Sequence, residues 1–595
     1  MLSSQRFGSV LPSSRPTKRV ASTNPNSTSS TPAQLARKVF LVKHGLTLAP
    51  GCIDWLGEFI EHFGIQEEDE IVDTFEHLVK GKITVELLEE TYEKLRVSAD
   101  QPDDGTGDDL DPANYLKIVD AFDMPLWRWD DSRGGFEKAK AAPTLAPTAL
   151  SKAQYLRDRF NIIKQVILRN EHFSPPTDVG PERQDYMKLT TIKNLLGRQG
   201  GHFLLFGLLT RMEDGEFYLE DLDDKVKLDL SDAAEQTPES GLFTEGSFVL
   251  VDGDYTHDSI FKVAEMGHPP SERRDEAMKI HGHHDFLGVG ALSAAEEARS
   301  SSSSSSSSLL PSTDARPSLP QFQADLILAE QSPAHETSFI ILSDLHLDNP
   351  KILAALRKVL GVYNDMDEKS IPRLFVLCGN FRGRPWVADG ENMREYADLF
   401  ATLASLLSSF PSLLAHSHFL LIPGPTDPWS SSTLPRPAIP APLVKALVAK
   451  IPNLTLGSNP CRVRWFSQEI VIFRDDLMGR MMRNAVRFGS EEDGAEGGRK
   501  KGDLRKALVQ TILDQAHLAP LPLPVRPVLW DYDHALRLYP MPTTLILADA
   551  FDPYKLVYEH CLVFNPGAFQ RRKFSWSTYH PHMGEVKERM EERCV

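Results

Sequence analysis

The chain of 595 residues is too long to fold around one hydrophobic core, so we expect about three domains. It carries 65 basic and 83 acidic residues, and the formal net charge of −18 argues against a protein that holds DNA by phosphate neutralisation alone. The five cysteines are scattered without a C-x-x-C pair, which indicates neither a zinc site nor a disulfide framework. No apolar run is long enough for a membrane span and no secretory leader opens the chain, so we expect an intracellular protein without a membrane partner.

The N-terminal part divides by composition into three segments. Residues 1–33 are rich in Ser, Pro, Asn and Thr and predict a disordered tail, in which R-P-T-K-R at 15–19 is a nuclear address or a solvated stretch. Helical periodicity over 34–97 predicts a helical docking domain. Residues 98–150 open with an aspartate-rich run and are predicted to be an acidic tether and connecting segment. A tethered bundle is typical of a docking module; a cap packed on the main body is the alternative.

The connecting segment and the next domain mix strand and helix patterns. We expect a strand within 113–129, a linker over 132–148 and a helix over 152–170. Short apolar runs at 203–209, 217–230, 247–252 and 260–264, separated by Gly and Asp turns, predict antiparallel strands. Residues 151–295 are therefore predicted to form a helix followed by a small closed β-barrel. A Ser-rich linker over 296–330 should follow.

Two features of this middle part invite functional interpretations. Phe217 and Tyr218 could stack on single-stranded bases, but the acidic residues around them would repel phosphates, so protein contact is favoured. The sequence H-G-H-H-D at 281–285 could hold a metal, but no second ligand cluster lies nearby in the sequence. We interpret it as a structural segment.

Four apolar runs in the last part of the chain end in polar turns. Residues 339–342, 373–378, 418–422 and 543–547 have the composition of buried strands, and helix-like segments lie between them. This alternation predicts a layered α/β domain over 331–595, with functional loops at the strand ends. Asp344 and His346 follow the first strand with one residue between them, a spacing at which a carboxylate and an imidazole can bind one divalent metal.

These strand ends resemble the loops of calcineurin-like metallophosphoesterases, which read D-x-H, G-D-x-x-D, G-N-H-[DE], a lone H and G-H-x-H. Only the first motif is intact, as Asp344 and His346. By resemblance, Asn380 replaces the carboxylate that bridges two metals, His517 stands for the lone histidine, and Asp549 falls on the last motif.

The remaining ligand positions of the resemblance carry residues that bind metals poorly or not at all: Gly383, Pro425, Thr426 and Phe551. A neutral amide at 380 cannot offset the repulsion between two dications as a bridging carboxylate does. We therefore expect a retained fold with a dismantled site, no catalytic residues, and no bound metal or other cofactor. The vestigial ligand positions are Asp344, His346, Asn380, His517 and Asp549.

A second resemblance covers most of the chain from about residue 110 onward, apart from inserts. It rests on S-D-L-H-L-D at 343–348, L-C-G-N-F at 377–381, I-P-G-P-T-D-P at 422–428, L-P-R-P at 434–437, S-N-P-C-R-V at 458–463, F-R-D-D-L-M-G-R-M-M-R-N-A-V-R-F at 473–488 and F-N-P-G-A-F at 564–569. The ordered set is similar to the B subunits of eukaryotic replicative DNA polymerases, and within them to those of DNA polymerase epsilon. The resemblance names the barrel as an OB-fold and the last domain as an inactive calcineurin-like phosphoesterase domain.

The resemblance implies a non-catalytic replication subunit in the nucleus. Its expected partners are the C-terminal region of the catalytic subunit of DNA polymerase epsilon, the GINS component of the replicative helicase through residues 34–97, and the small histone-fold subunits of the holoenzyme, with DNA contacted only within the assembly. Two alternatives stay open at this point: a phosphodiesterase that uses one weakly held metal, and an autonomous single-strand DNA-binding module. Metal content tests the first, and a steep salt dependence of DNA binding tests the second.

Overall fold

The computed structural model divides the chain into two compact units, Met1–Asp109 and Leu110–Val595. It describes residues 47–48, 52–53, 56, 82–83, 115–174, 186–233, 240–282, 284–289, 326–330, 337–429, 431–486, 503–571 and 573–590. In the first unit, the short strands β1 (Thr47–Leu48) and β2 (Lys82–Ile83) pair in parallel. The predicted tail over 1–33, most of the predicted helical domain over 34–97, the aspartate-rich start of the predicted tether over 98–150, most of the predicted linker over 296–330 and residues 491–502 lie outside the described residues.

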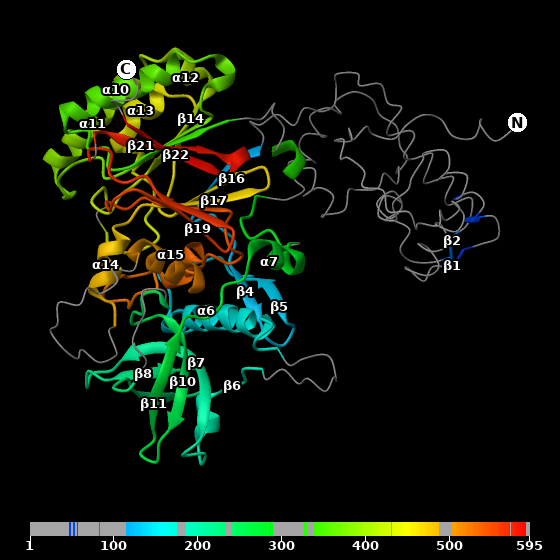
Figure 1. Ribbon diagram of the computed structural model, residues 1–595. Coiled ribbons are helices and arrows are strands. Elements are labelled where there is room, and N and C mark those ends of the chain that lie inside the picture. Colours follow the sequence, from blue (N-terminus) through cyan, green and yellow to red (C-terminus); the bar gives the residue numbers. More distant parts are fainter. Residues whose placement is uncertain are drawn as a thin grey trace, which may run out of the picture. The chain divides into compact units, whose positions relative to one another are not determined.

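Two six-stranded sheets form the centre of the second unit (Figure 1). The first sheet has the order β15, β14, β13, β12, β21, β22, and its strands are Leu454–Leu456, His418–Ile422, Leu374–Cys378, Phe339–Leu342, Ser575–His580 and Glu585–Met590. The second has the order β19, β20, β18, β17, β16, β3, and its strands are Tyr554–Tyr558, Cys561–Asn565, Thr544–Leu547, Gln468–Phe473, Cys461–Trp465 and Leu116–Asp120. The four strands β12 to β15 pair in parallel, so their carboxyl ends meet at one edge.

Alternation of side chains along β12 and β13 explains the layers. Phe339 and Ile341 point into a core shared with Val463 and Ile472 of the second sheet, whereas Ile340 and Leu342 point into a core shared with helices. Because both faces are buried, the strands read as continuous apolar runs rather than alternating ones. The result is a sandwich of two sheets between two helical layers.

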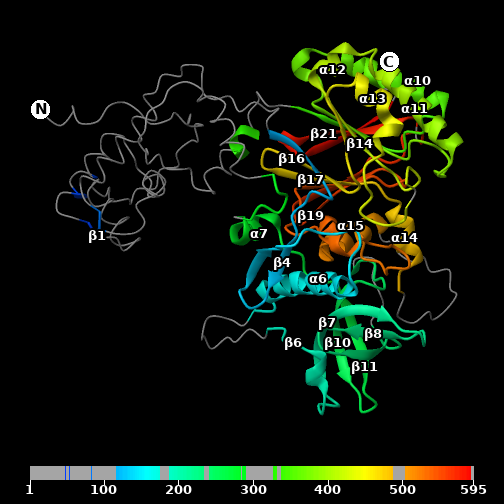
Figure 2. The same cartoon turned by 180° about the vertical axis from the view of Figure 1, so that it is seen from behind.

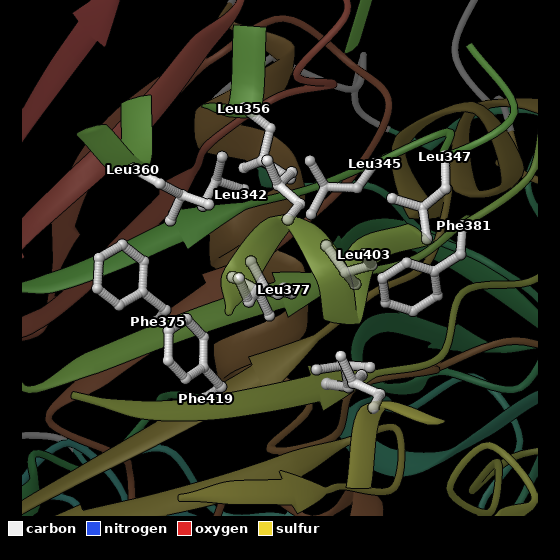
Figure 3. Packing of buried hydrophobic residues seen from close by; sticks show 14 of the residues in the cluster. Leu342, Leu345, Leu347, Leu356, Leu360, Phe375, Leu377, Phe381, Leu403 and Phe419 are labelled. Atoms are coloured by element: carbon white, nitrogen blue, oxygen red, sulfur yellow. The ribbon is translucent and has the colours of Figure 1, made fainter. Parts of the chain in front are cut away.

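Helices on the outer face of the first sheet complete its core. They are α10 (Pro350–Asn364), α11 (Gly390–Leu407), α12 (Pro411–His416) and α13 (Lys445–Lys450). Leu356 and Leu360 of α10 and Leu403 of α11 point toward Leu377 and Phe375 of β13 (Figure 3). The caps are set by the sequence: the side chain of Asn349 accepts a hydrogen bond from the Lys351 amide with Pro350 at the first helical position.

The outer face of the second sheet packs against α14 (Leu477–Arg483) and α15 (Leu504–Asp514). Short 3-10 turns join the larger elements at Ile192–Leu195, Glu368–Ser370, Ala441–Val444, Trp530–Leu536 and Pro581–Met583. In the part of the chain that the structure describes, no helix is both long enough and apolar enough for a membrane span.

A barrel precedes this sandwich in the chain. Its strands are β6 (Leu189–Thr190), β7 (His202–Arg211), β8 (Phe217–Glu220), β9 (Lys225–Asp229), β10 (Phe248–Tyr255) and β11 (Ile260–Gly267), and the pairing of β10 with β7 closes the sheet. A register shift between Asp252 and Gly253 bends β10, and a Cβ at 253 would lie 2.1 Å from the Lys262 carbonyl oxygen. The predicted closed barrel is confirmed.

Helix α6 (Ala149–Arg169) lies between the barrel and the sandwich (Figure 1, Figure 2). Its residues Phe160 and Ile163 pack on Phe206 and Phe248 of the barrel. From the sandwich, Gln515 accepts a hydrogen bond from the Phe248 amide at 2.7 Å and donates one to its carbonyl oxygen at 2.6 Å. The barrel and the sandwich are therefore joined through buried side-chain to backbone contacts.

The segments before and after the barrel are more ordered than expected. β3 pairs with β16 and becomes an edge of the second sheet, while β4 (Trp127–Asp130) and β5 (Gly135–Lys138) form a hairpin. The prediction of a linker over 132–148 is thus wrong at β5, because the consecutive glycines at 134 and 135 are typical of a turn or linker rather than of a strand. The predicted linker over 296–330 also ends early, because residues 326–330 are helical and Leu326 is buried between the sheets.

Candidate functional site

Asp344 is the centre of the predicted site at the carboxyl end of β12. The residue has a positive φ of 56°, which turns the chain sharply after the strand. Its carboxylate is buried, and its Oδ1 accepts hydrogen bonds from the Asn380 backbone amide at 3.2 Å and from Asn380 Nδ2 at 3.1 Å. Asp344 therefore holds the loop after β13 against the end of β12.

The guanidinium group of Arg474 contacts the same carboxylate. Arg474 follows β17 and is fully buried. Its Nη2 lies 2.7 Å from Asp344 Oδ1, and its Nη1 lies 2.8 Å from Asp476 Oδ1. Its Nε donates a hydrogen bond to the Gly379 carbonyl oxygen at 2.7 Å. Burial alone would lower the pKa of Arg474, but its two carboxylate partners raise it above its ordinary value. A permanent cation of the protein is thus bound to the first predicted metal ligand.

Asn380 is engaged at both ends of its amide. Its Nδ2 donates to Asp344, while its Oδ1 accepts a hydrogen bond from the Thr426 amide at 2.9 Å. The backbone is equally tight here, since a Cβ at Gly379 would lie 1.8 Å from Asp427 Oδ2. Asn380 therefore links the loop after β13 to the loop after β14.

Asp427 is a buried residue that stabilises the loop after β14 through its carboxylate. Its carboxylate accepts hydrogen bonds from the amides of Gly424 and Phe381 and from the hydroxyl of Tyr396 at 2.7 Å. Burial raises the pKa of Asp427, and these hydrogen bonds oppose the rise. All of its described hydrogen-bond partners are backbone amides or a buried tyrosine.

His346 lies beside Asp344, with its Nε2 at 3.8 Å from Asp344 Oδ1 and 17% of its side chain exposed. The neighbouring Asp348 accepts two hydrogen bonds from the Gly383 amide. A Cβ at 383 would lie 3.7 Å from the Nδ1 of His346, so the glycine borders the imidazole. The structure thus brings Asp344, His346 and Asn380 together; the motif spacing predicted this for Asp344 and His346, and the resemblance implied it for Asn380.

Asp549 is connected to this group indirectly. Its carboxylate accepts hydrogen bonds from the amides of Met478, in the first turn of α14, and Phe551. Burial, opposed by these two bonds, raises the pKa of Asp549 to about 6. The next residue, Ala550, donates to Asp476, which in turn contacts Arg474.

His517 has a different environment. It is buried, its Nε2 lies 3.1 Å from Asp533 Oδ1, and its Nδ1 accepts a hydrogen bond from the Ala519 amide at 3.1 Å. Burial lowers the pKa of His517, with a further contribution from the nearby Arg159. Both ring nitrogens hold the turn after α15, and no contact of the described residues joins His517 to Asp344.

Comparison with known proteins adds to this geometry. A family model for the B subunit of DNA polymerases alpha and epsilon matches residues 339–555, and one described as a DNA polymerase epsilon subunit 2-like OB-fold domain matches residues 149–270. The DNA polymerase epsilon B subunit of Schizosaccharomyces pombe is 36% identical over 487 residues, which cover 79% of this chain and 76% of that protein. The protein of the same name from Arabidopsis thaliana is 33% identical over 558 residues, which cover 91% of this chain and 96% of that protein.

The chain belongs to the family of DNA polymerase epsilon B subunits. DNA polymerase epsilon subunit 2 of Homo sapiens is a further relative, 32% identical over 554 residues, with coverage of 91% of this chain and 96% of that protein. Among solved structures, an archaeal phosphodiesterase is 12% identical, with coverage of 42% of this chain and 99% of that chain and a TM-score of 0.22. The family and its OB-fold, both expected from the sequence, are confirmed.

In this member of the B-subunit family, sequence reasoning missed the residue that changes the site most. Arg474 lies in the run F-R-D-D at 473–476, but its pairing with Asp344 spans 130 positions and no local pattern indicates it. The available signal was an arginine directly after the apolar run that ends strand β17 (Gln468–Phe473). Asp427 likewise lies in P-G-P-T-D-P, where the sequence alone assigned it no role.

The other two candidate features lie away from Asp344. In the segment 281–285, His281 packs edge-on against Phe136 at 5.1 Å and His284 lies 4.8 Å from the ring of Trp127. On the barrel, Arg211 covers the ring of Phe217 and Lys225 covers that of Tyr218. Within the described residues, no group of three or more His, Cys, Asp or Glu side chains is arranged to hold a metal ion.

Proposed function

We propose that the chain is a non-catalytic accessory subunit of the DNA polymerase epsilon holoenzyme, acting in chromosomal DNA replication in the nucleus. Membership of the B-subunit family supports the assembly, and the pairing of Arg474 with Asp344 supports the absence of catalysis. The second observation carries most weight, because it concerns the atoms that a phosphoesterase would use.

The donor set does not fit a centre with two metal ions. In such a centre the two cations lie about 3.5 to 4 Å apart. They require a carboxylate that bridges them and open ligand positions for water. Here Asp344 is bound to a guanidinium, Asn380 uses both ends of its amide, and Asp549 accepts two backbone hydrogen bonds. A cation at Asp344 would be repelled by the buried charge of Arg474. We therefore assign no catalytic step to this site.

Two attachment surfaces are part of the proposal. Residues 113–595 contain the barrel and the sandwich, whose buried contacts suit them to grip the C-terminal region of the catalytic subunit as one body. Residues 34–97 fall in the other compact unit and are proposed to bind the GINS component of the replicative helicase. The small histone-fold subunits would join the same holoenzyme. Separate units on one chain raise the effective concentration of one partner near the other.

Binding of DNA by the isolated chain is not favoured by the barrel. The two rings that could stack on bases, Phe217 and Tyr218, already lie under Arg211 and Lys225, and Tyr218 also donates a hydrogen bond to Asp214. For bases to stack on the two rings, these contacts would have to break. The many carboxylates around the rings would also repel the phosphates of the strand. DNA is therefore proposed to be contacted only within the assembly.

The test is reconstitution with the catalytic subunit of DNA polymerase epsilon. The full chain and a variant lacking residues 1–97 are each co-expressed with that subunit and separated by gel filtration. Both should elute with it in equimolar amounts, because the second compact unit carries the proposed interface. The deletion should abolish binding to GINS in the same assay. Loss of the polymerase pair on deletion, or retained GINS binding, would show that the assignment of surfaces is wrong.

A further inference from the structure

Three arginine side chains converge on one carboxylate next to Arg474. Arg526 Nη2 lies 2.7 Å from Asp475 Oδ1, Arg436 Nη2 lies 3.5 Å from the same oxygen, and Arg480 Nε lies 3.9 Å from Asp475 Oδ2. We call Arg436, Arg480 and Arg526 with Asp475 the arginine cluster. Its members come from three different segments: the loop after β14, the β17–α14 connection with α14, and the loop before Trp530–Leu536.

The chain holds two of these arginines rigidly. Each is followed by a proline, in L-P-R-P and P-V-R-P, and the two loops run side by side. The Leu434 amide donates to the Pro527 carbonyl oxygen at 2.9 Å, and the Leu529 amide donates to the Leu434 carbonyl oxygen at 2.7 Å. Proline fixes its own φ and restricts the residue before it, so little conformational freedom is left in these loops. The donors of Arg436 and Arg526 are therefore preorganised.

The charges in the arginine cluster do not balance. Arg436 and Arg526 are 4% and 1% exposed, and three guanidinium groups share the single carboxylate of Asp475. With Arg474, Asp344 and Asp476 included, four arginines face three aspartates, and the Asp476 side chain is 47% exposed, so that solvent screens its charge. Burial, offset in part by Asp475 and reinforced by repulsion from Arg436 and Arg480, lowers the pKa of Arg526 to about 10. An uncompensated buried charge is costly, so an additional anion would stabilise this arrangement.

Unused hydrogen-bond donors point to the same conclusion. Among the described residues, the buried atoms Nη1 of Arg436 and Nε of Arg526 have no hydrogen-bond acceptor, and Nη2 of Arg436, Nη2 of Arg526 and Nε of Arg480 have only the ion pair with Asp475. Buried arginine nitrogens are normally satisfied, and planar guanidinium groups suit bidentate binding of oxyanions. Arg480 is the most exposed member, with 24% of its side chain accessible, and α14 lies at one edge of the fold in both views (Figure 1, Figure 2).

We propose that the arginine cluster binds a phosphate group that carries two negative charges, such as inorganic phosphate or a phosphate monoester. Within the arginine cluster, three positive charges face the single carboxylate of Asp475, and a dianion offsets this excess of two, whereas a monocarboxylate or a phosphodiester does not. The site is separate from the predicted metal ligands and does not depend on the proposed replication function. It assigns a ligand to the run F-R-D-D-L-M-G-R, whose role the sequence left open.

The experiment measures thermal unfolding of the full chain in rising inorganic phosphate against chloride at constant ionic strength, with calorimetric titration of phosphate. Ligand binding to the folded state should raise the melting temperature in a concentration-dependent way. Arg480→Gln should weaken phosphate binding about tenfold, the size expected for one charged hydrogen bond. Arg483→Gln is the matched control, because Arg483 lies on the same helix, is exposed, and makes the same charge change.

Four results with the wild-type chain or Arg480→Gln would overturn the proposal. They are a melting temperature insensitive to phosphate, an Arg480→Gln variant that responds like the wild type, an equal response to acetate, and an equal response to a short oligonucleotide that carries only phosphodiesters. One more variant tests whether the chain supplies its own anion: Glu491→Gln, Glu492→Gln and Asp493→Asn combined. If phosphate stabilises this triple variant but not the wild type, the counter-charge belongs to the chain and the ligand assignment is wrong. A response in both proteins that Arg480→Gln weakens supports the proposal.

Discussion

The contact between Asp344 and Arg474 shows how one side chain alters the chemistry of a site. In a metal centre, a carboxylate at a strand end binds a cation that comes from solvent. Here the cation is covalently part of the protein and reaches Asp344 from β17, while Asn380 supplies two further donors to the same oxygen. The carboxylate therefore stabilises the junction of three loops.

Removing one partner of this buried pair should be strongly destabilising. We expect Arg474→Leu to lower the free energy of unfolding by about 3 to 5 kcal/mol, because Asp344 is left buried without its counter-charge. The double variant with Asp344→Asn should recover part of that loss. Urea denaturation of both proteins, with the exposed Arg483→Leu as control, measures the effect. Strictly additive losses would contradict a direct pairing.

Asp514 predicts a pH dependence of stability. It is 5% exposed and accepts a hydrogen bond from the Tyr558 hydroxyl at 2.8 Å, and burial, opposed by such hydrogen bonds, raises its pKa from 3.8 to about 7. A carboxyl whose folded pKa lies above its unfolded pKa favours the folded state most at low pH, and this contribution is lost as the pH rises from about 4 through 7.

The variant Asp514→Asn removes this titration. Between pH 5 and pH 8, we expect the wild type to lose about 2 to 3 kcal/mol of stability relative to the variant. Urea denaturation midpoints at the two pH values give the comparison. Parallel pH profiles of the two proteins would mean that Asp514 ionises normally in the folded state.

At the scale of elements, α15 joins the barrel to the sandwich. Thr511 Oγ1 accepts a hydrogen bond from the Leu242 amide at 2.7 Å, and one turn later Gln515 satisfies both backbone groups of Phe248. All of these atoms are buried, so each lost bond leaves a polar group without water. Together with α6, this short stretch fixes the relative placement of the two domains.

Gln515→Ala should therefore loosen the barrel from the sandwich. We expect a loss of about 2 to 4 kcal/mol, since two buried backbone groups lose their partners. Limited proteolysis should cut the region between the barrel and the sandwich faster in this variant than in the wild type. Lys506→Ala, at an exposed position of the same helix, serves as the control. Equal cleavage rates in all three proteins would show that the contact does not hold the domains together.

The sequence predicted those elements whose burial leaves a local pattern. Strand β12 and its neighbours are buried on both faces and appear as apolar runs, so their polar ends, including Asp344 and Asn380, could be placed together. Strand β3 could not be assigned to the second sheet, because its partner β16 lies more than three hundred residues away. The pairing of Arg474 and the placement of His517 beside Asp533 are long-range or buried contacts of the same kind.

At the scale of the whole molecule, the two compact units carry the two proposed attachment surfaces. The second compact unit encloses the barrel, the sandwich and the Asp344 group, and the first unit carries the segment proposed to reach the helicase. The hydrogen bonds around Asp344, Asn380 and Asp427 close the strand ends, which suits the proposed scaffold better than an open reaction centre.

The most direct test of the central claim is elemental analysis of the purified chain together with a model phosphodiester assay in excess manganese. The chain should carry no stoichiometric metal and should show no turnover above buffer, because Asp344 is bound by Arg474 and the remaining donors are engaged in loop contacts. His346→Ala should leave both measurements unchanged. Near-unit metal occupancy, together with turnover that His346→Ala abolishes, would contradict the account and establish the chain as an enzyme.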